Sequence, residues 1–235
     1  LFSKEYYDDE YVFINFKLMD RIEKVGEEII VETGASLSSL SWFAVENNIK
    51  GFEFLEDVPG SVGGAIIMNA GTYEDTISQL TKQVTYYNIK EDKFTTDTVK
   101  IGDFGRRHSK WADDNIVVIS SVMRAESGDY IESLEKLLEI KKKRYLKQPR
   151  NYPNAGSVFK RPKLNGKDYY VWKLFEELGL RGYSKNDAKI SEKHPGFIVN
   201  TGNAKPDDVL FLIDLAKEKV KEKFDIKLEL EWKVI

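Results

Sequence analysis

The sequence has no cysteine and only two histidines, His108 and His194. Without cysteine, the chain forms no disulfide, no thiolate nucleophile, no cysteine-ligated zinc site and no iron–sulfur cluster. Two histidines are too few for a multi-histidine metal site, so we expect no metal cofactor. The lack of cysteine is also typical of a reducing compartment and favours a cytoplasmic protein.

Long apolar runs and an excess of one charge are missing as well. No run approaches the roughly 18 apolar residues of a membrane-spanning helix, and no secretory signal is recognisable. We therefore expect no membrane partner. Lys and Arg (36) are interspersed with Asp and Glu (39), for a net charge of -3, so we expect no nucleic-acid partner either. The chain of 235 residues is 41% hydrophobic and 32% charged, which is typical of one large or two modest globular domains.

Glycine is concentrated in residues 59–72, which read Pro-Gly-Ser-Val-Gly-Gly-Ala-Ile-Ile-Met-Asn-Ala-Gly-Thr. Gly60, Gly63, Gly64 and Gly71 allow positive φ angles and the close approach of a ligand to the main chain. Consecutive N–H groups in such a loop can hold phosphate or other polar oxygens. A tight turn between two buried elements explains the glycines equally well, so the pattern alone is weak evidence for a ligand.

Periodic apolar residues predict a mixture of strands and helices. Runs of β-branched and aromatic residues predict strands at 11–16, 29–32, 83–89, 116–121 and 197–200. Helical spacing predicts helices at 37–44, 131–145, 171–178 and 206–220, the first with Ser36 as its N-cap and the last with Pro206 at its first position. Strict alternation of apolar and charged residues predicts a half-buried strand at 226–234.

A break at Ser127-Gly-Asp129 predicts two domains, residues 1–128 and 129–235. Strands and helices follow one another without a regular βαβ rhythm, so the expected fold class is α+β. The basic run Lys141-Lys-Lys-Arg144 falls at the end of a predicted helix. A solvated helix end is the interpretation we favour for it, because cations suit the helix dipole there.

Four segments, in order, resemble one enzyme family. Residues 51–71 are similar to the flavin-binding loop of the UDP-N-acetylenolpyruvoylglucosamine reductase (MurB) family, and 152–160 (Tyr-Pro-Asn-Ala-Gly-Ser-Val-Phe-Lys) to its catalytic-serine motif. Residues 191–203 resemble a third segment of the family, and 228–231 (Leu-Glu-Leu-Glu) stand where its terminal catalytic glutamate lies. The short link between residues 119 and 130 and the Tyr-Pro at 152–153 resemble the shorter, type II branch.

This resemblance implies a fold. The N-terminal domain is expected to be the C-terminal part of a two-subdomain FAD-binding domain (PCMH/VAO type), and the C-terminal domain a MurB-type substrate-binding domain. Leu1-Phe-Ser3 looks like the residues just after the family's Gly-Ser-Asn phosphate loop. The first FAD-binding subdomain is therefore expected to be missing from this chain, which leaves independent FAD binding as a question for experiment.

The resemblance also implies an activity. NADPH reduces FAD, and the flavin then passes a hydride to UDP-N-acetylglucosamine enolpyruvate, giving UDP-N-acetylmuramate for peptidoglycan synthesis. A small sugar nucleotide is thus the expected partner, and the protein is expected to be a monomeric, cytoplasmic dehydrogenase that contributes to cell-wall biogenesis, cell shape and cell division. In such an enzyme the flavin carries the redox chemistry, while the protein holds the substrate, stabilises the developing enolate and delivers one proton.

Three residues match the family's catalytic positions: Ser157 as proton donor, Glu231 as stabiliser of the enolate and Arg107 as partner of the substrate carboxylate. Their alternatives are a turn serine that bonds locally, a solvated strand carboxylate and a surface arginine. The resemblance favours the catalytic roles.

The same comparison assigns residues to ligands. The expected cofactor-binding residues are Gly34, Ala35, Pro59, Gly60, Ser61, Gly63, Gly64, Asn69, Ala70 and Gly71. The expected substrate-binding residues are Lys147, Lys160 and Arg107, although a solvated side chain explains Lys147 equally well. His194 suggests a Ser-His hydrolase, but the sequence has no G-x-S-x-G elbow, and a structural or surface role is expected for it.

Some positions depart from the family pattern: Arg106 (usually Tyr), Arg161 (Asn), Asn186-Asp-Ala-Lys189 (Gly-Gly-Ala-Gln) and Lys233 (Arg). Arg to Lys loses the planar fork of donors. These departures keep two alternatives open. One is a fragment or sugar-nucleotide binding module without turnover, and the other is a related FAD oxidoreductase with a different substrate.

Overall fold

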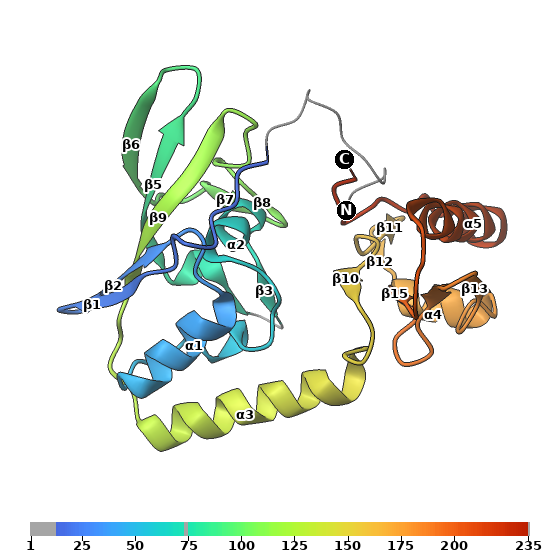
Figure 1. The fold of residues 1–235 in the computed structure, drawn as a ribbon, viewed down its shortest axis with the longest axis horizontal. Coiled ribbons are helices and arrows are strands. Elements are labelled where there is room, and N and C mark those ends of the chain that lie inside the picture. Colours follow the sequence, from blue (N-terminus) through green and yellow to red (C-terminus); the bar gives the residue numbers. More distant parts are fainter. Residues whose placement is uncertain (1–12, 73–74, 235) are drawn as a thin grey trace. The chain divides into compact units, whose positions relative to one another are not determined.

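The computed structural model describes residues 13–72 and 75–234, and they fall into two compact units, 13–144 and 145–234 (Figure 1). We call these the N-terminal and C-terminal units. The units divide at Tyr145, inside a helix, whereas the break predicted at Ser127-Gly-Asp129 lies before that helix.

The N-terminal unit is built on a five-stranded antiparallel sheet in the order β1-β2-β9-β5-β6. Its strands are β1 (Ile22–Val25), β2 (Glu28–Glu32), β5 (Thr81–Asn88), β6 (Lys93–Thr98) and β9 (Ile116–Arg124). In β2, Ile29 and Val31 are fully buried while Ile30 between them is exposed, as the period of two requires. The predicted strands at 29–32, 83–89 and 116–121 are therefore confirmed.

Short helices and hairpins complete this unit. The helices are α1 (Leu37–Glu46), α2 (Val62–Met68), the 3₁₀ turns η1 (Glu53–Leu55) and η2 (Ile77–Gln79), and most of α3 (Tyr130–Lys147). The hairpins are β3 (Gly71–Thr72) with β4 (Asp75–Thr76), and β7 (Phe104–Gly105) with β8 (His108–Ser109). α1 begins as predicted, because the Ser36 hydroxyl accepts a hydrogen bond from the Ser39 N–H at 2.9 Å. Buried residues of β2, α1, α2 and β9 form one core.

The C-terminal unit has a four-stranded sheet in the order β10-β15-β14-β13. Its strands are β10 (Asn154–Ser157), β13 (Ser184–Lys185), β14 (Ala188–Ile190) and β15 (Phe197–Asn200), and a separate hairpin pairs β11 (Lys163–Leu164) with β12 (Lys167–Asp168). The helices α4 (Val171–Glu177) and α5 (Pro206–Phe224) occur where the sequence predicts them. Phe175 and Ile213, from these helices, lie in one core with Ile198 of β15.

Two strand predictions differ from the structure. Residues 13–16 form no strand, and the rest of the strand expected at 11–16 lies outside the described residues. Residues 226–234 keep the predicted alternation at first, since Ile226 and Leu228 are buried and Lys227 and Glu229 exposed. Their strand pairing is limited to one bridge, between Leu230 and Phe159, so the segment is extended without being a ladder strand.

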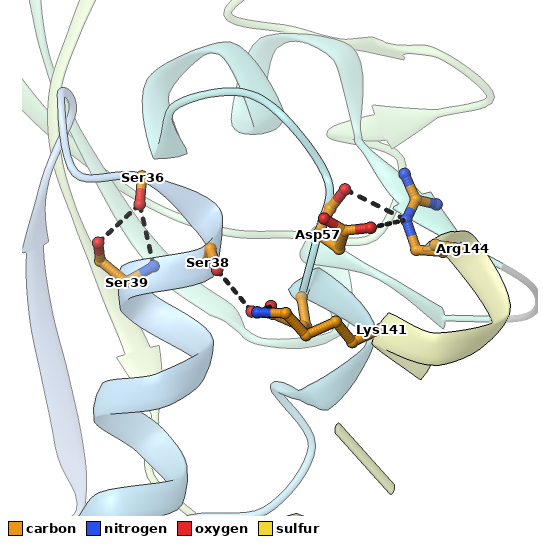
Figure 2. Close-up of polar contacts among 7 residues, drawn as sticks. Ser36, Ser38, Ser39, Asp57, Lys141 and Arg144 are labelled. Carbon is orange, nitrogen blue, oxygen red and sulfur yellow. Dashed lines mark hydrogen bonds and ion pairs between the residues drawn. The ribbon is translucent and has the colours of Figure 1, made fainter. Parts of the chain in front are cut away.

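Cationic side chains of helix α3 bond to the turn formed by residues 53–57 in the N-terminal unit. Lys141 Nζ lies 2.8 Å from Glu56 Oε1, and Arg144 Nε donates to the Asp57 carbonyl at 3.2 Å (Figure 2). The Glu56 side chain is 1% exposed, and its second oxygen accepts a hydrogen bond from the Ser38 hydroxyl. The basic run at 141–144 is therefore only partly a solvated helix end.

We expect Lys141→Met to lower the free energy of unfolding by about 1–2 kcal/mol, because it leaves the buried Glu56 carboxylate with one partner fewer. Methionine is a flexible side chain of similar length without the charge, so the variant also loses the cation–π contact of Lys141 Nζ with the Trp42 ring, whose centroid is 5.7 Å away. Chemical denaturation followed by circular dichroism measures the change. Lys142→Met is the matched control, since Lys142 is exposed and its change should stay within about 0.5 kcal/mol. Equal effects of the two variants would contradict this role of Lys141.

Candidate functional site

The glycine-rich stretch folds into the short helix α2, which begins at Val62 and ends at Met68. The Ser61 hydroxyl caps it by accepting a hydrogen bond from the Gly64 N–H at 3.4 Å. A Cβ on Gly63 would overlap Thr33 Oγ1 and come within 3.2 Å of Thr33 Cβ. Gly63 is therefore required for the close packing of α2 on the turn after β2.

The amides at the start of α2 are bonded within the chain. The Val62 N–H donates to the Ala35 carbonyl and the Gly63 N–H to the Thr33 carbonyl, both at 2.9 Å. These two amides therefore do not form part of the nest of free N–H groups that the glycine pattern suggests. Instead, they bond the loop to residues 33–35. These partners lie about thirty positions earlier in the chain, and no local sequence pattern predicts the contact.

A hollow of about 260 Å³ lies beside the start of α2. Its wall combines loop and helix residues with one end of β9, and it is lined by Phe16, Thr33, Ser61, Gly63, Gly64, Ile67, Ile116, Val117 and Val118. Three predicted cofactor-binding residues, Ser61, Gly63 and Gly64, are among them. The apolar wall and the exposed backbone of Gly64 fit part of a flat, mostly apolar ring system such as a flavin.

The other predicted cofactor residues lie in two settings. Pro59 and Gly60 are exposed, directly before Ser61. Gly34, Ala35, Ala70 and Gly71 pack against the chain itself: a Cβ on Gly34 would overlap the Phe16 carbonyl, and one on Gly71 the Asp75 carbonyl. Ala35 is 1% exposed, and Ala70 packs partly buried against the core. Their packing supports the loop around the hollow.

Asn69 ends α2 in a left-handed conformation, with φ of 44°. Its side-chain amide donates to the Gly105 carbonyl at 2.9 Å, and its oxygen accepts from the Ser78 N–H at 3.4 Å. Gly105 is the last residue of β7, directly before Arg106 and Arg107 at the tip of the β7–β8 hairpin. The predicted cofactor residue Asn69 is thus bonded to the hairpin that carries the predicted catalytic Arg107.

The base of this hairpin is fixed independently of Asn69. Lys110 Nζ lies 3.0 Å from Asp103 Oδ2 and 3.2 Å from Asp97 Oδ2. Burial lowers the pKa of Lys110, but hydrogen bonds to Asp103 and Asp97 outweigh it and place the pKa above its ordinary value. Trp111 is 1% exposed and packs on Phe104, with ring centroids 5.2 Å apart.

A separate group of predicted site residues lies in the C-terminal unit around Ser157, the last residue of β10. Ser157 is exposed and pairs with Phe197 of β15 across an irregular register. Gly156 before it has φ of 81°, a conformation that favours glycine, and its N–H donates to the Asn154 side chain at 3.0 Å. The turn thus presents Ser157 at the surface on a defined backbone.

Glu231 and Lys160 lie beside Ser157 because residues 158–160 pair with 229–231. The Glu231 N–H donates to the carbonyl of Val158, the neighbour of Ser157, and the Lys160 N–H donates to the Glu229 carbonyl, both at 2.9 Å. Lys160 Nζ lies 3.6 Å from Glu229 Oε2. The structure therefore brings Ser157, Lys160 and Glu231 together in one unit, while Arg107 belongs to the other. Lys147 is exposed at the end of α3.

The departure at Asn186-Asp187 has a structural explanation. Asn186 adopts φ of 48° in the β13–β14 turn and donates to Asp208 Oδ1 at 2.7 Å, near the start of α5. Asp187 Oδ2 accepts from the Asn203 N–H at 2.7 Å. Both side chains therefore have partners within the C-terminal unit: Asn186 bonds to a side chain near α5 and Asp187 to a backbone N–H.

Two other departures have protein partners as well. The Arg161 guanidinium lies 4.4 Å from the centroid of the Tyr170 ring, and Lys189 Nζ lies 2.9 Å from Glu192 Oε1. Cation–π contacts of this kind contribute about 0.5–1 kcal/mol at exposed sites.

His194 has a structural setting. Its Nδ1 accepts a hydrogen bond from the Gly196 N–H at 3.1 Å, and its ring meets Phe197 edge-on at 4.9 Å. Burial holds the pKa of His194 below its ordinary value.

Among the described residues, no three carboxylate or imidazole side chains gather into a metal-ligand set, and no helix has the length and apolarity to cross a bilayer.

Comparison with protein-family models gives two matches. Residues 148–235 match the C-terminal domain of UDP-N-acetylenolpyruvoylglucosamine reductase, and residues 2–89 match an FAD binding domain. The fold class expected from the sequence, an FAD-binding domain followed by this C-terminal domain, is confirmed.

Relatives with the same name align over nearly the whole chain. The UDP-N-acetylenolpyruvoylglucosamine reductase of Fervidobacterium nodosum is 41% identical over 231 residues, covering 95% of this chain and 72% of its own length. That of Thermotoga petrophila is 40% identical and covers 95% and 77% of the two chains. Among solved structures, the reductase (MurB) of Thermus caldophilus superposes with a TM-score of 0.75 at 31% identity, covering 87% of this chain and 71% of its own.

Proposed function

The chain belongs to the UDP-N-acetylenolpyruvoylglucosamine reductase family, and from this premise we propose that it reduces UDP-N-acetylglucosamine enolpyruvate to UDP-N-acetylmuramate. NADPH is the proposed hydride donor. The observation that supports the proposal is the pairing of residues 158–160 with 229–231, in which the Glu231 N–H donates to the carbonyl of Val158, the neighbour of Ser157. Two residues that the resemblance assigns from distant parts of the sequence thereby have neighbouring backbones.

FAD, when bound, supplies the hydride chemistry of this reaction. Ser61, Gly63 and Gly64 would hold it at the hollow beside α2, and the apolar residues of the hollow would exclude water from the ring. Pro59 and Gly60 extend the same surface, and Gly34, Ala35, Ala70 and Gly71 shape the loop from behind. This division into contact and support residues is part of the proposal.

The chain's own residues manage charge and the proton. Arg107 binds the substrate carboxylate through its planar guanidinium, and Lys147 and Lys160 attract the anionic substrate. Negative charge develops on that carboxylate as the hydride arrives at the vinyl carbon, and Glu231, in its carboxylic-acid form, donates a hydrogen bond to the resulting enolate. Ser157 Oγ then delivers its proton to the neighbouring carbon, which completes the lactyl group. Addition of one hydride and one proton balances the reduction.

We propose a monomeric cytoplasmic enzyme that contributes to peptidoglycan synthesis, and thereby to cell shape and division. The family assignment and the sugar-nucleotide substrate of its relatives support these roles.

The test uses the complete protein saturated with FAD. We expect NADPH to be consumed only when UDP-N-acetylglucosamine enolpyruvate is added. The amount of NADPH consumed should equal the amount of UDP-N-acetylmuramate formed. UDP-N-acetylglucosamine, which lacks the enolpyruvyl group, is the matched control and should cause no consumption. In deuterated water, the carbon next to the carboxylate should carry deuterium from solvent, while deuterium at the methyl carbon depends on exchange of the reduced flavin N–H before hydride transfer. A protein that holds FAD but oxidises no NADPH with the enolpyruvyl substrate would rule the proposal out.

A further inference from the structure

We propose that Asn69 is a positioning residue for Arg107: its side chain fixes the conformation of the β7–β8 hairpin tip, and so the direction of the Arg107 guanidinium. This inference rests on the proposed function, in which Arg107 binds the substrate carboxylate. It gives Asn69 a role different from the cofactor contact that the resemblance implies.

The contacts of Asn69 point to this role. Both polar atoms of its side chain have protein partners, the carbonyl of Gly105 and the N–H of Ser78. Gly105 is bonded at the point where the chain leaves β7 and enters the two-residue tip. On the other strand, the buried Ser109 hydroxyl donates to the Ile67 carbonyl of α2 at 3.2 Å. The C-terminal end of α2 therefore holds both strands of the hairpin.

The backbone of Arg107 is an independent observation. Among the described residues, non-glycine positions with positive φ are Asn48, Asp57, Asn69, Asp92, Arg107, Asn165, Asn186 and Asp225. Arg107, with φ of 57°, is the member of this set that is neither Asn nor Asp. A left-handed conformation is unfavourable for a long side chain and persists where surrounding contacts impose it. The bond from Asn69 to Gly105, two residues earlier, is such a contact.

Because Asn69 is in the left-handed conformation, its side chain can be removed without straining the backbone. Glycine adopts φ of 44° without strain, so Asn69→Gly removes the side chain and keeps the end of α2. Asn69→Asp keeps shape and acceptor but replaces the donated N–H by an oxygen that faces the Gly105 carbonyl. Asn48→Gly is the matched control, because it also replaces a left-handed asparagine after a helix, with φ of 56°.

The first measurement is amide hydrogen exchange over residues 104–110 in the protein without added cofactor. We expect faster exchange there in Asn69→Gly and Asn69→Asp than in the parent, and no change in Asn48→Gly. Unchanged exchange in both Asn69 variants would overturn the inference. This measurement does not depend on turnover, so it remains decisive if the proposed function fails.

The second measurement is steady-state kinetics in the complete, FAD-saturated protein. We expect Asn69→Gly to lower kcat/KM for the sugar nucleotide roughly threefold to tenfold, as for the loss of one hydrogen bond. The KM for NADPH and the affinity for FAD should stay within about twofold of the parent. Because Asn69 acts through Arg107, Asn69→Gly should add nothing in an Arg107→Ala background. Additive losses, or a loss of FAD affinity with unchanged hairpin exchange, would overturn the proposal. No turnover by the parent would refute the proposed function instead.

Discussion

Replacing Ser157 by alanine is expected to lower kcat by about 10²–10⁴-fold, the range for removal of a positioned general acid. The hydroxyl is the group proposed to protonate the substrate, and its removal leaves hydride transfer without a matched proton. Ser157 is exposed at the end of β10, so the variant should fold as the parent does. KM for the sugar nucleotide should change little, because other side chains, Arg107, Lys147 and Lys160, are the ones proposed to bind it.

Stopped-flow and steady-state assays separate the two half-reactions of Ser157→Ala. Reduction of the bound flavin by NADPH should keep its parental rate, while its reoxidation by the enolpyruvyl substrate should slow. Ser184→Ala is the matched control, an exposed serine in β13 of the same sheet, and should retain parental kcat. A Ser157→Ala variant that reoxidises its flavin at the parental rate would assign the proton to another donor.

Hydrophobic periodicity predicted most elements because each depends on local sequence. The Ser36 cap, the buried alternation of Ile29 and Val31, and the start of α5 at Pro206 are all decided within a few residues. The end of the chain shows the limit of that reasoning. Alternation from Ile226 predicts which side chains are buried, but it does not determine the length over which a neighbouring strand pairs. Here the pairing covers only residues 158–160 and 229–231, around the bridge between Phe159 and Leu230.

The candidate site was predicted from resemblance, and its neighbourhood depends on contacts that sequence spacing does not reveal. Glu231 bonds to Val158, the neighbour of Ser157, because the chain returns after α5 to pair with residues 158–160. Asn69 lies 36 positions from Gly105, so its bond to the hairpin has no local signature. The roles of the individual residues remain predictions, and the structure adds which partners each one has.

Gly63→Ala is expected to lower the free energy of unfolding of the N-terminal unit by about 1–3 kcal/mol, the cost of overpacking a filled site. The added Cβ overlaps Thr33 Oγ1 and lies 3.2 Å from Thr33 Cβ, which rotation of the side chain does not move; the rotation itself is restricted because threonine is β-branched. Thr33→Ala removes both groups and should recover most of the loss when combined with Gly63→Ala. Denaturation of the two single variants and the double variant measures this coupling, and strictly additive effects would contradict the packing explanation.

Gly64→Ala is the matched change one residue later, and it separates stability from cofactor binding. A Cβ there meets only Ser61 Oγ, at 3.6 Å, so the variant should be as stable as the parent, or more stable by up to about 1 kcal/mol as alanine replaces a helical glycine. The same methyl group projects beside Ser61 at the hollow, where it should weaken FAD binding about tenfold. Flavin fluorescence titration of the complete protein measures that affinity. Parental FAD affinity in a stable Gly64→Ala variant would mean that the cofactor does not occupy the hollow beside α2, because a ligand in contact with Gly64 would meet the added methyl group.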